Sequence, residues 1–532
     1  MPEASGSGLE IRLSGARVCR QWPPPLLLAA GVAGPLIVVL PIGEVLLEVA
    51  RIGPAQAVRL LWRPLVGELL VNTIGLVIAA TLSAALIGTA AAWLVERTDM
   101  PARRFFAVAA AVPLAVPPFI SSYAWLSISP ALEGFLGALI VVSFSYFPLV
   151  YLPVAASLRG MDPALEETAR SLGQGAGGTF LRVVLPQLRP ALLGGMLLVA
   201  LNVLVEFGAF ALLRFRTFTT ELYAEYRTGF NGPGEALLAL VLLSLCLFCL
   251  FAELRIRGLA RYARIGSGVR RPAAPLSLGR AHLAVLALFA LLALAALGVP
   301  LGMILYWLTR HASAAVTPAE VSLEGLAEAT FSSVWLGLAG AALTVVLALP
   351  LGLLATRYPG RLVTLLERAA YLGQGVPGIV IALAFITITI RTMQPLYQTA
   401  ATLIVAYAIL FLPLALVSVR AALTQAQRRL EEVGRSLGLG WFSVAWRIML
   451  PLAGPGLGAA AALVFISIVT ELTATLLLAP IGTNTLAMQI WADTSTLAFA
   501  AAAPYAAMMV VLSLISTWLL TRRFGATRLF QH

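Results

Sequence analysis

The chain has 532 residues, of which 60% are hydrophobic and 11% are charged, and its mean hydropathy is +0.93. A chain this apolar is not a soluble globular protein and must use lipid as its main solvent. The formal net charge of +12 comes from arginine, because the sequence contains no lysine. A phosphate-binding loop and a Schiff-base lysine are therefore excluded, and any ATP hydrolysis must occur on another polypeptide.

Twelve apolar runs follow a polar and basic N-terminal tail. Each approaches or exceeds the ~20 residues needed to cross a ~30 Å hydrocarbon core. A cleaved signal peptide is the alternative for the first run, but no short small-residue cleavage site follows it, so we interpret it as a retained helix. The runs lie near residues 26–47, 67–95, 104–128, 131–157, 191–213, 236–254, 282–307, 331–356, 369–390, 399–419, 456–479 and 498–520.

The third and ninth runs contain clustered proline and glycine. Such residues kink helices or open a bend, so we expect a kink or a bend in both spans, with either a hinge or a packing role. The residues concerned are Pro113, Pro117, Pro118, Gly373, Gly375, Pro377 and Gly378.

One polar stretch occurs twice. Residues 166–173 read Glu-Glu-Thr-Ala-Arg-Ser-Leu-Gly, residues 431–438 read Glu-Glu-Val-Gly-Arg-Ser-Leu-Gly, and a Leu-Pro pair follows each at the same distance. The offset is a constant 265 residues, which indicates an internal duplication. Upstream the offset falls to 260, which pairs Arg97 with Arg357.

Each copy is predicted to form a short helix, a break and a second short helix. Asp162 and Pro163 suit the start of the first copy, and Thr424 with Gln427 has capping-box spacing in the second. Gly173 and Gly438 are expected to end the first helix of each copy in the left-handed conformation.

The arginines are distributed unequally between the two sides of the membrane. With a cytoplasmic N-terminus, 28 of the 36 arginines lie inside, together with both duplicated loops and the C-terminus. The expected division is a tail (1–25), a first half (26–256) with its loop at 158–190, a linker (257–281), a second half (282–521) with its loop at 422–455, and a tail (522–532). The fold class is therefore an all-α integral membrane protein with two parallel six-helix repeats.

Two acidic residues lie at equivalent places in the fifth predicted span of each half. Glu206 and Glu471 occupy equivalent positions, as do Thr220 and Thr485 at the same offset, and all four are candidates for a translocation pathway. Carboxylates in hydrocarbon usually face a bundle interior or a water-filled path. The alternative is that each carboxylate accepts hydrogen bonds from a nearby broken helix and holds the shape of a gate. No metal site can be defined from the sequence.

The duplicated motif resembles the cytoplasmic loop of binding-protein-dependent ABC importer permeases, although the family's Glu-Ala-Ala appears here as Glu-Glu-Thr-Ala and Glu-Glu-Val-Gly. The resemblance implies a type I importer permease in the bacterial inner membrane, with both halves fused in one chain. It implies partners, namely two ATPase subunits, which bind ATP and Mg, and an extracytoplasmic binding protein, while this chain is no enzyme and binds no cofactor. Glu166 and Glu431 are expected to pair with basic residues of the ATPase groove. The implied coupling residues are Glu166, Glu167, Ala169, Leu172, Gly173, Glu431, Glu432, Gly434, Leu437 and Gly438.

Segments 206–209, 217–220 and 471–478 look most like the ferric iron branch of this family, so ferric iron is the expected substrate. Thiamine, polyamines, phosphonates and inorganic anions are alternatives within the same family. A secondary transporter of six plus six helices is a second alternative, but it gives no reason for a duplicated loop motif.

Overall fold

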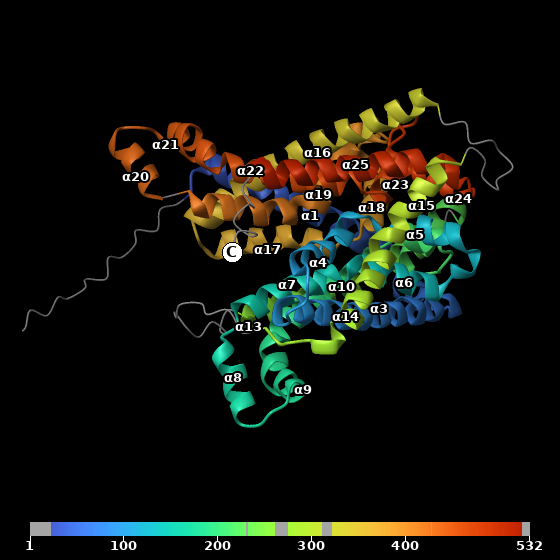
Figure 1. Ribbon diagram of the computed structural model, residues 1–532. Coiled ribbons are helices and arrows are strands. Elements are labelled where there is room, and N and C mark those ends of the chain that lie inside the picture. Colours follow the sequence, from blue (N-terminus) through green and yellow to red (C-terminus); the bar gives the residue numbers. More distant parts are fainter. Residues whose placement is uncertain (1–22, 230–231, 261–274, 311–321, 427, 524–532) are drawn as a thin grey trace, which may run out of the picture.

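The computed structural model describes residues 23–229, 232–260, 275–310, 322–426 and 428–523, and helices form most of it (Figure 1). Within these ranges the only β contact is an isolated bridge between Thr98 and Leu276. Most of the predicted linker, the two tails and Gln427 lie outside the described residues.

The long helices follow the predicted spans. Among the described residues, ten helices are long and apolar enough to cross a membrane, and two bent pairs bring the number to twelve if each pair is one span. The first half contains α1 (Pro25–Ile52), α3 (Pro64–Arg97), the pair α4 (Arg103–Ala109) and α5 (Pro118–Ile128), α6 (Phe135–Tyr146) with α7 (Pro148–Gly160), α10 (Leu185–Val205) and α13 (Gly232–Ala260). The second half contains α14 (His282–Ala293) with α15 (Val299–Leu308), α16 (Leu323–Arg357), the pair α17 (Arg361–Tyr371) and α18 (Gly378–Thr392), α19 (Ala400–Gln425), α22 (Leu450–Val469) and α25 (Phe499–Arg523).

The predicted bends in the third and ninth spans are confirmed. The two pairs bend by 95° and 104°, and Pro117 and Pro377 directly precede the second helix of each pair. A glycine at the second bend also permits close packing, because a Cβ on Gly373 would lie 2.7 Å from the carbonyl oxygen of Ile409 in α19.

The first span of each half lies against the opposite half. Helix α1 packs on α16, α17 and α18, whereas α15 packs on α5 (Figure 1). Phe289 of α14 likewise contacts Phe106 of α4, with ring centroids 5.3 Å apart. The two halves are therefore interlocked at both ends of the duplication.

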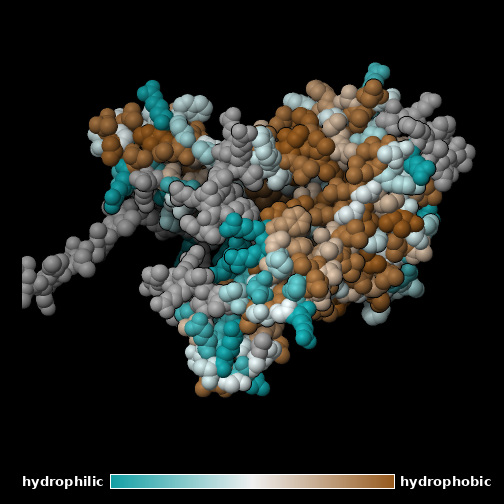
Figure 2. Space-filling view, viewed as in Figure 1, coloured by the Kyte–Doolittle hydropathy of each residue, from teal (hydrophilic) through white to brown (hydrophobic). Residues whose placement is uncertain are grey.

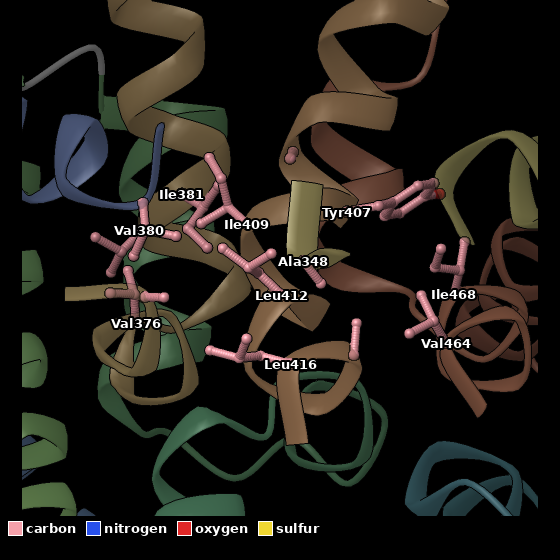
Figure 3. Packing of buried hydrophobic residues seen from close by; sticks show 14 of the residues in the cluster. Ala348, Val376, Val380, Ile381, Tyr407, Ile409, Leu412, Leu416, Val464 and Ile468 are labelled. Atoms are coloured by element: carbon pink, nitrogen blue, oxygen red, sulfur yellow. The ribbon is translucent and has the colours of Figure 1, made fainter. Parts of the chain in front are cut away.

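The second half is built around a continuous apolar core. Val376 and Val380, at the bend before and within α18, face Ile409 and Leu412 of α19 (Figure 3), and all four side chains are buried. This packing fixes the broken span against an unbroken one, so the bend is part of a rigid unit.

Candidate functional site

Two knobs project from the same end of the molecule, well apart from each other (Figure 1). The first knob consists of α8 (Pro163–Ser171), α9 (Ala176–Thr179) and a π-helical turn (Phe180–Val184). The second knob consists of α20 (Arg428–Ser436), α21 (Trp441–Val444) and an equivalent turn (Ala445–Met449). Each turn continues directly into the fifth span of its half, α10 or α22, so the last helix of the knob and the span form one mechanical element.

The glycines end the first helix of each knob as predicted. Gly173 and Gly438 have φ values of +82° and +84°, in the left-handed region that favours glycine. In the first knob the amide of Gly173 donates to Arg170 and that of Gln174 to Ala169, which is the paired pattern of a Schellman motif. The same pair of bonds closes the second knob.

Of the two predicted helix starts, one is confirmed and the other is wrong. Asp162 accepts a hydrogen bond of 3.0 Å from the amide of Ala164, which confirms it as the N-cap of α8. The capping prediction for Thr424 is wrong, because this residue lies inside α19 and its hydroxyl donates back to the carbonyl of Arg420. Helix α19 extends several residues beyond its apolar run, so Thr424 lies before the break between α19 and α20.

The first glutamate of each motif is buried. Glu166 and Glu431 are 3% and 5% exposed, and each pairs with the arginine that ends the second span of its own half. Since neither carboxylate faces outward, the expectation that they pair with basic residues of a partner's groove is not met. The arginines are Arg97 at the end of α3 and Arg357 at the end of α16.

The two ion pairs differ in geometry. Arg357 Nε donates to Glu431 Oε1 at 2.8 Å, and its Nη2 donates to the carbonyls of Leu423 and Ala426 at 3.2 Å each. Arg97 Nη2 lies 2.8 Å from Glu166 Oε1, but the angle is not that of a hydrogen bond. The arginine that ties the second knob to its half therefore makes more hydrogen bonds than its equivalent in the first half.

The remaining motif residues divide between an inner and an outer face. Ala169 and Gly434 are buried, and a Cβ on Gly434 would lie 2.6 Å from Ile448, so a small residue is needed where the knob's two helices meet. The exposed residues are Glu167, Leu172, Gly173, Glu432, Leu437 and Gly438.

Glu206 and Glu471 lie where the fifth spans end. Each accepts a hydrogen bond from the amide three residues ahead, Ala209 at 3.0 Å and Ala474 at 2.8 Å. They thus cap the short helices α11 (Gly208–Leu212) and α23 (Thr473–Leu478), in which free amides would otherwise lack partners. Both carboxylates therefore make the hydrogen bond to a broken helix that the gate-shaping alternative expects.

The two carboxylates are not equivalent beyond the cap. Glu206 Oε2 also accepts a hydrogen bond of 2.7 Å from the hydroxyl of Tyr146. Glu471 receives no side-chain donor among the described residues and borders a cavity of about 10 Å³, close to the space that one water occupies. The other residues that line this cavity are the hydroxyl-bearing Ser333, Tyr407, Thr475 and Thr485 and the apolar Leu336, Ile468 and Val469.

Hydrogen bonds correct the pairing of Thr220 with Thr485. Thr485 is the N-cap of α24 (Leu486–Ser495), and the matching N-cap of α12 (Phe218–Ala224) is Thr217. The amide after each cap donates to an equivalent hydroxyl on the second span, Thr73 or Ser333. The local offset is therefore 268 instead of 265, and Thr220 instead completes the capping box of Thr217.

The breaks of the two halves touch each other. A Cβ on Gly208 would lie 2.8 Å from Leu472 Cδ2 and 3.0 Å from Phe119 Cβ, so these segments are in direct contact. The ring of Phe207 packs on Trp491 of the other half at 5.4 Å and on Tyr223 at 5.0 Å. The halves are therefore in contact at this level, toward the end of the molecule opposite the knobs (Figure 1).

The sequence pairs Arg97 with Arg357 but gives these arginines no role, and it does not predict the contact of Phe207 with Trp491. The equivalent positions of the two arginines in the repeat were the sequence signal that could have indicated a shared role. Within the described residues, no group of three or more His, Cys, Asp or Glu is placed to hold a metal ion.

Comparison with known proteins gives two kinds of match. The family profile described as "Binding-protein-dependent transport system inner membrane component" matches residues 84–261 and again residues 348–523. The chain is 40% identical over 485 residues to the Fe(3+)-transport system permease protein FbpB 2 of Haemophilus influenzae, covering 91% of this chain and 95% of that protein. It is 27% identical to the Escherichia coli sulfate transport system permease protein CysT over 41% of this chain and 86% of that protein. It is also 27% identical to the Escherichia coli molybdenum transport system permease protein ModB over 33% of this chain and 86% of that protein.

Proposed function

The chain belongs to the family of binding-protein-dependent transport system inner membrane components, as an ABC importer permease with two fused halves, and we propose that its substrate is ferric iron. The observation that carries the proposal is the match to the Haemophilus influenzae Fe(3+) permease, which runs through both halves and nearly the full length of each chain. The sulfate and molybdenum permeases match only about a third to two fifths of this chain. Those relatives make an oxyanion the second candidate substrate.

In this proposal two ATPase subunits bind the knobs on the cytoplasmic side, and an external binding protein delivers the substrate. Closing of the ATPases on ATP moves the knobs. The ion pairs Arg97–Glu166 and Arg357–Glu431 then pass the movement to α3 and α16, while the π-helical turns pass it to α10 and α22. Rigid-body displacement of these spans separates the contact between Gly208 and Leu472 and opens the outer end.

The difference between the two carboxylates supports distinct roles in the pathway. Glu206 uses both carboxylate oxygens within its own half, so it holds the shape of the closed gate. Glu471 accepts no hydrogen bond from a side chain among the described residues and lies beside a cavity that several hydroxyl-bearing residues border, and oxygen ligands suit hard cations. We assign Glu471 to the pathway together with Thr485, and Glu206 and Thr220 to its support.

Radioiron uptake in a strain that lacks the chromosomal gene tests the substrate, with sulfate, molybdate, thiamine and polyamine uptake measured in parallel. Uptake of iron alone supports the proposal, whereas restored sulfate or molybdate uptake replaces iron with an oxyanion. Purification from the same strain tests which energy source drives transport. An ATPase pair that purifies with the chain is expected, and uptake driven by a proton gradient without one would identify a secondary transporter instead.

A further inference from the structure

The two knobs share a motif but not the surface around it. The motif leucines are equally exposed, Leu172 at 79% and Leu437 at 77%, so the motif itself presents the same group on both sides. One helical turn earlier the second knob has the exposed Val433 where the first has the exposed Thr168. The apolar face of α20 is therefore wider than that of α8.

The second helices of the knobs differ more. Phe442 and Trp446 are 72% and 65% exposed and lie four residues apart, on one side of a helix. Their equivalents in the first knob, 265 residues earlier, are Gly177 and Leu181. The first knob does contain an aromatic residue, but Phe180 packs on Trp93 of its own bundle at 4.8 Å between ring centroids.

The exposed aromatic residues of the second knob lie on the same projection as the exposed motif residue Leu437. Figure 2 shows hydrophobic residues over α20 and α21, while the knob of α8 and α9 is mostly hydrophilic on the same face. Because they share this knob with the motif, they adjoin the surface that the proposed function gives to the ATPase. Buried tryptophan and other aromatic side chains commonly carry most of the affinity of a protein interface.

We propose that the knobs dock their ATPase subunits unequally, and that the second knob is the permanent anchor. Phe442 and Trp446 insert into an apolar groove of the ATPase, whereas the first knob docks through Leu172 and polar contacts and releases more readily. This inference rests on the proposed function and adds an order of assembly to it. The first knob is then the one from which an ATPase subunit dissociates sooner.

The test uses the full chain in lipid nanodiscs with the ATPase that purifies with it, labelled and free of nucleotide. Dissociation of the ATPase from wild type is expected in two phases that differ at least tenfold in rate. The variant Phe442→Ala/Trp446→Leu should lose the slow phase, and the reciprocal variant Gly177→Phe/Leu181→Trp should slow the fast one. Leu172→Ala and Leu437→Ala form the matched control, because the two leucines are equally exposed and each substitution should speed its own phase by a similar factor.

A single phase in wild type, or aromatic substitutions that leave the ratio unchanged, would overturn the inference. It would also be overturned if Phe442→Ala/Trp446→Leu reduced only the amount of protein in the membrane, since the aromatic groups would then contact lipid. Absence of any ATPase from both knobs of wild type would instead contradict the proposed function, so the two failures are distinguishable.

Discussion

At the scale of single residues, the buried pair Arg357–Glu431 ties the second knob to α16. Removing one partner of a buried ion pair typically costs about 3–5 kcal/mol, because the other charge stays buried without compensation. Arg357→Ala is expected to loosen the knob, which protease sensitivity of the loop would report, and to lower uptake at least tenfold. The double variant Arg357→Glu/Glu431→Arg should recover part of the uptake, whereas equal loss in the single and double variants would contradict a pairing role. The control is Arg435→Ala, at an exposed position of α20, the helix that also carries Glu431, and this variant should retain uptake.

Gly173 and Gly438 provide a second residue-scale prediction. No atom lies within 4 Å of an added Cβ at either position, so a substitution acts through backbone strain and charge instead of a clash within the chain. Left-handed backbone costs a residue with a side chain roughly 1–2 kcal/mol, and asparagine tolerates it best. Gly173→Asp or Gly438→Asp should leave the protein inserted but abolish substrate-stimulated ATPase activity, and Gly438→Asn should retain most of it. Normal stimulation and uptake in both aspartate variants would show that the turns do not couple.

At the scale of elements, α11 and α23 meet where the fifth spans break. Gly208→Val should hold the two short helices apart, because its Cβ would approach Leu472 and Phe119 to within about 3 Å. The expected result is a leak, measured as ATP-independent entry of substrate or of a thiol reagent that reaches a cysteine placed at Gly378. Gly208→Val/Leu472→Ala removes the opposing Cδ2 atom and should restore the seal at least in part. A tight seal in Gly208→Val would show that this contact is not the closure.

Elements were the scale at which the sequence was most informative. Apolar runs predicted the spans, proline and glycine predicted both bent pairs, and the motif glycines predicted the knob turns, because each signal is local. The partner of Glu166 was not predictable, since Arg97 lies 69 residues away and only the folded bundle brings them together. Thr220 was paired wrongly because a local three-residue shift between the halves is invisible beside a constant offset.

At the scale of the whole molecule, each half packs its first span against the opposite half, so each half depends on the other. Helix α1 packs on α16, α17 and α18, and α14 and α15 cover the first half, so neither half can bury its own surface alone. The bridge between Thr98 and Leu276 also fastens the end of the linker to the first half beside Arg97. Movement of either knob must therefore be shared by both halves.

This dependence predicts how a divided chain behaves. If the chain is cut between residues 266 and 267 and the two pieces are co-expressed, they should purify together and support uptake, because the exchanged helices and not the linker hold the halves. Deleting residues 25–52 from the first piece should abolish the association, since the surface of α16, α17 and α18 then loses its cover. Arg391→Ala is the control for that contact. It breaks an ion pair to Glu48 at the end of α1, but Arg391 is 47% exposed and such pairs contribute only about 0–1 kcal/mol, so the pieces should still associate. Association of the shortened first piece with the second at wild-type yield would contradict the idea that α1 joins the halves.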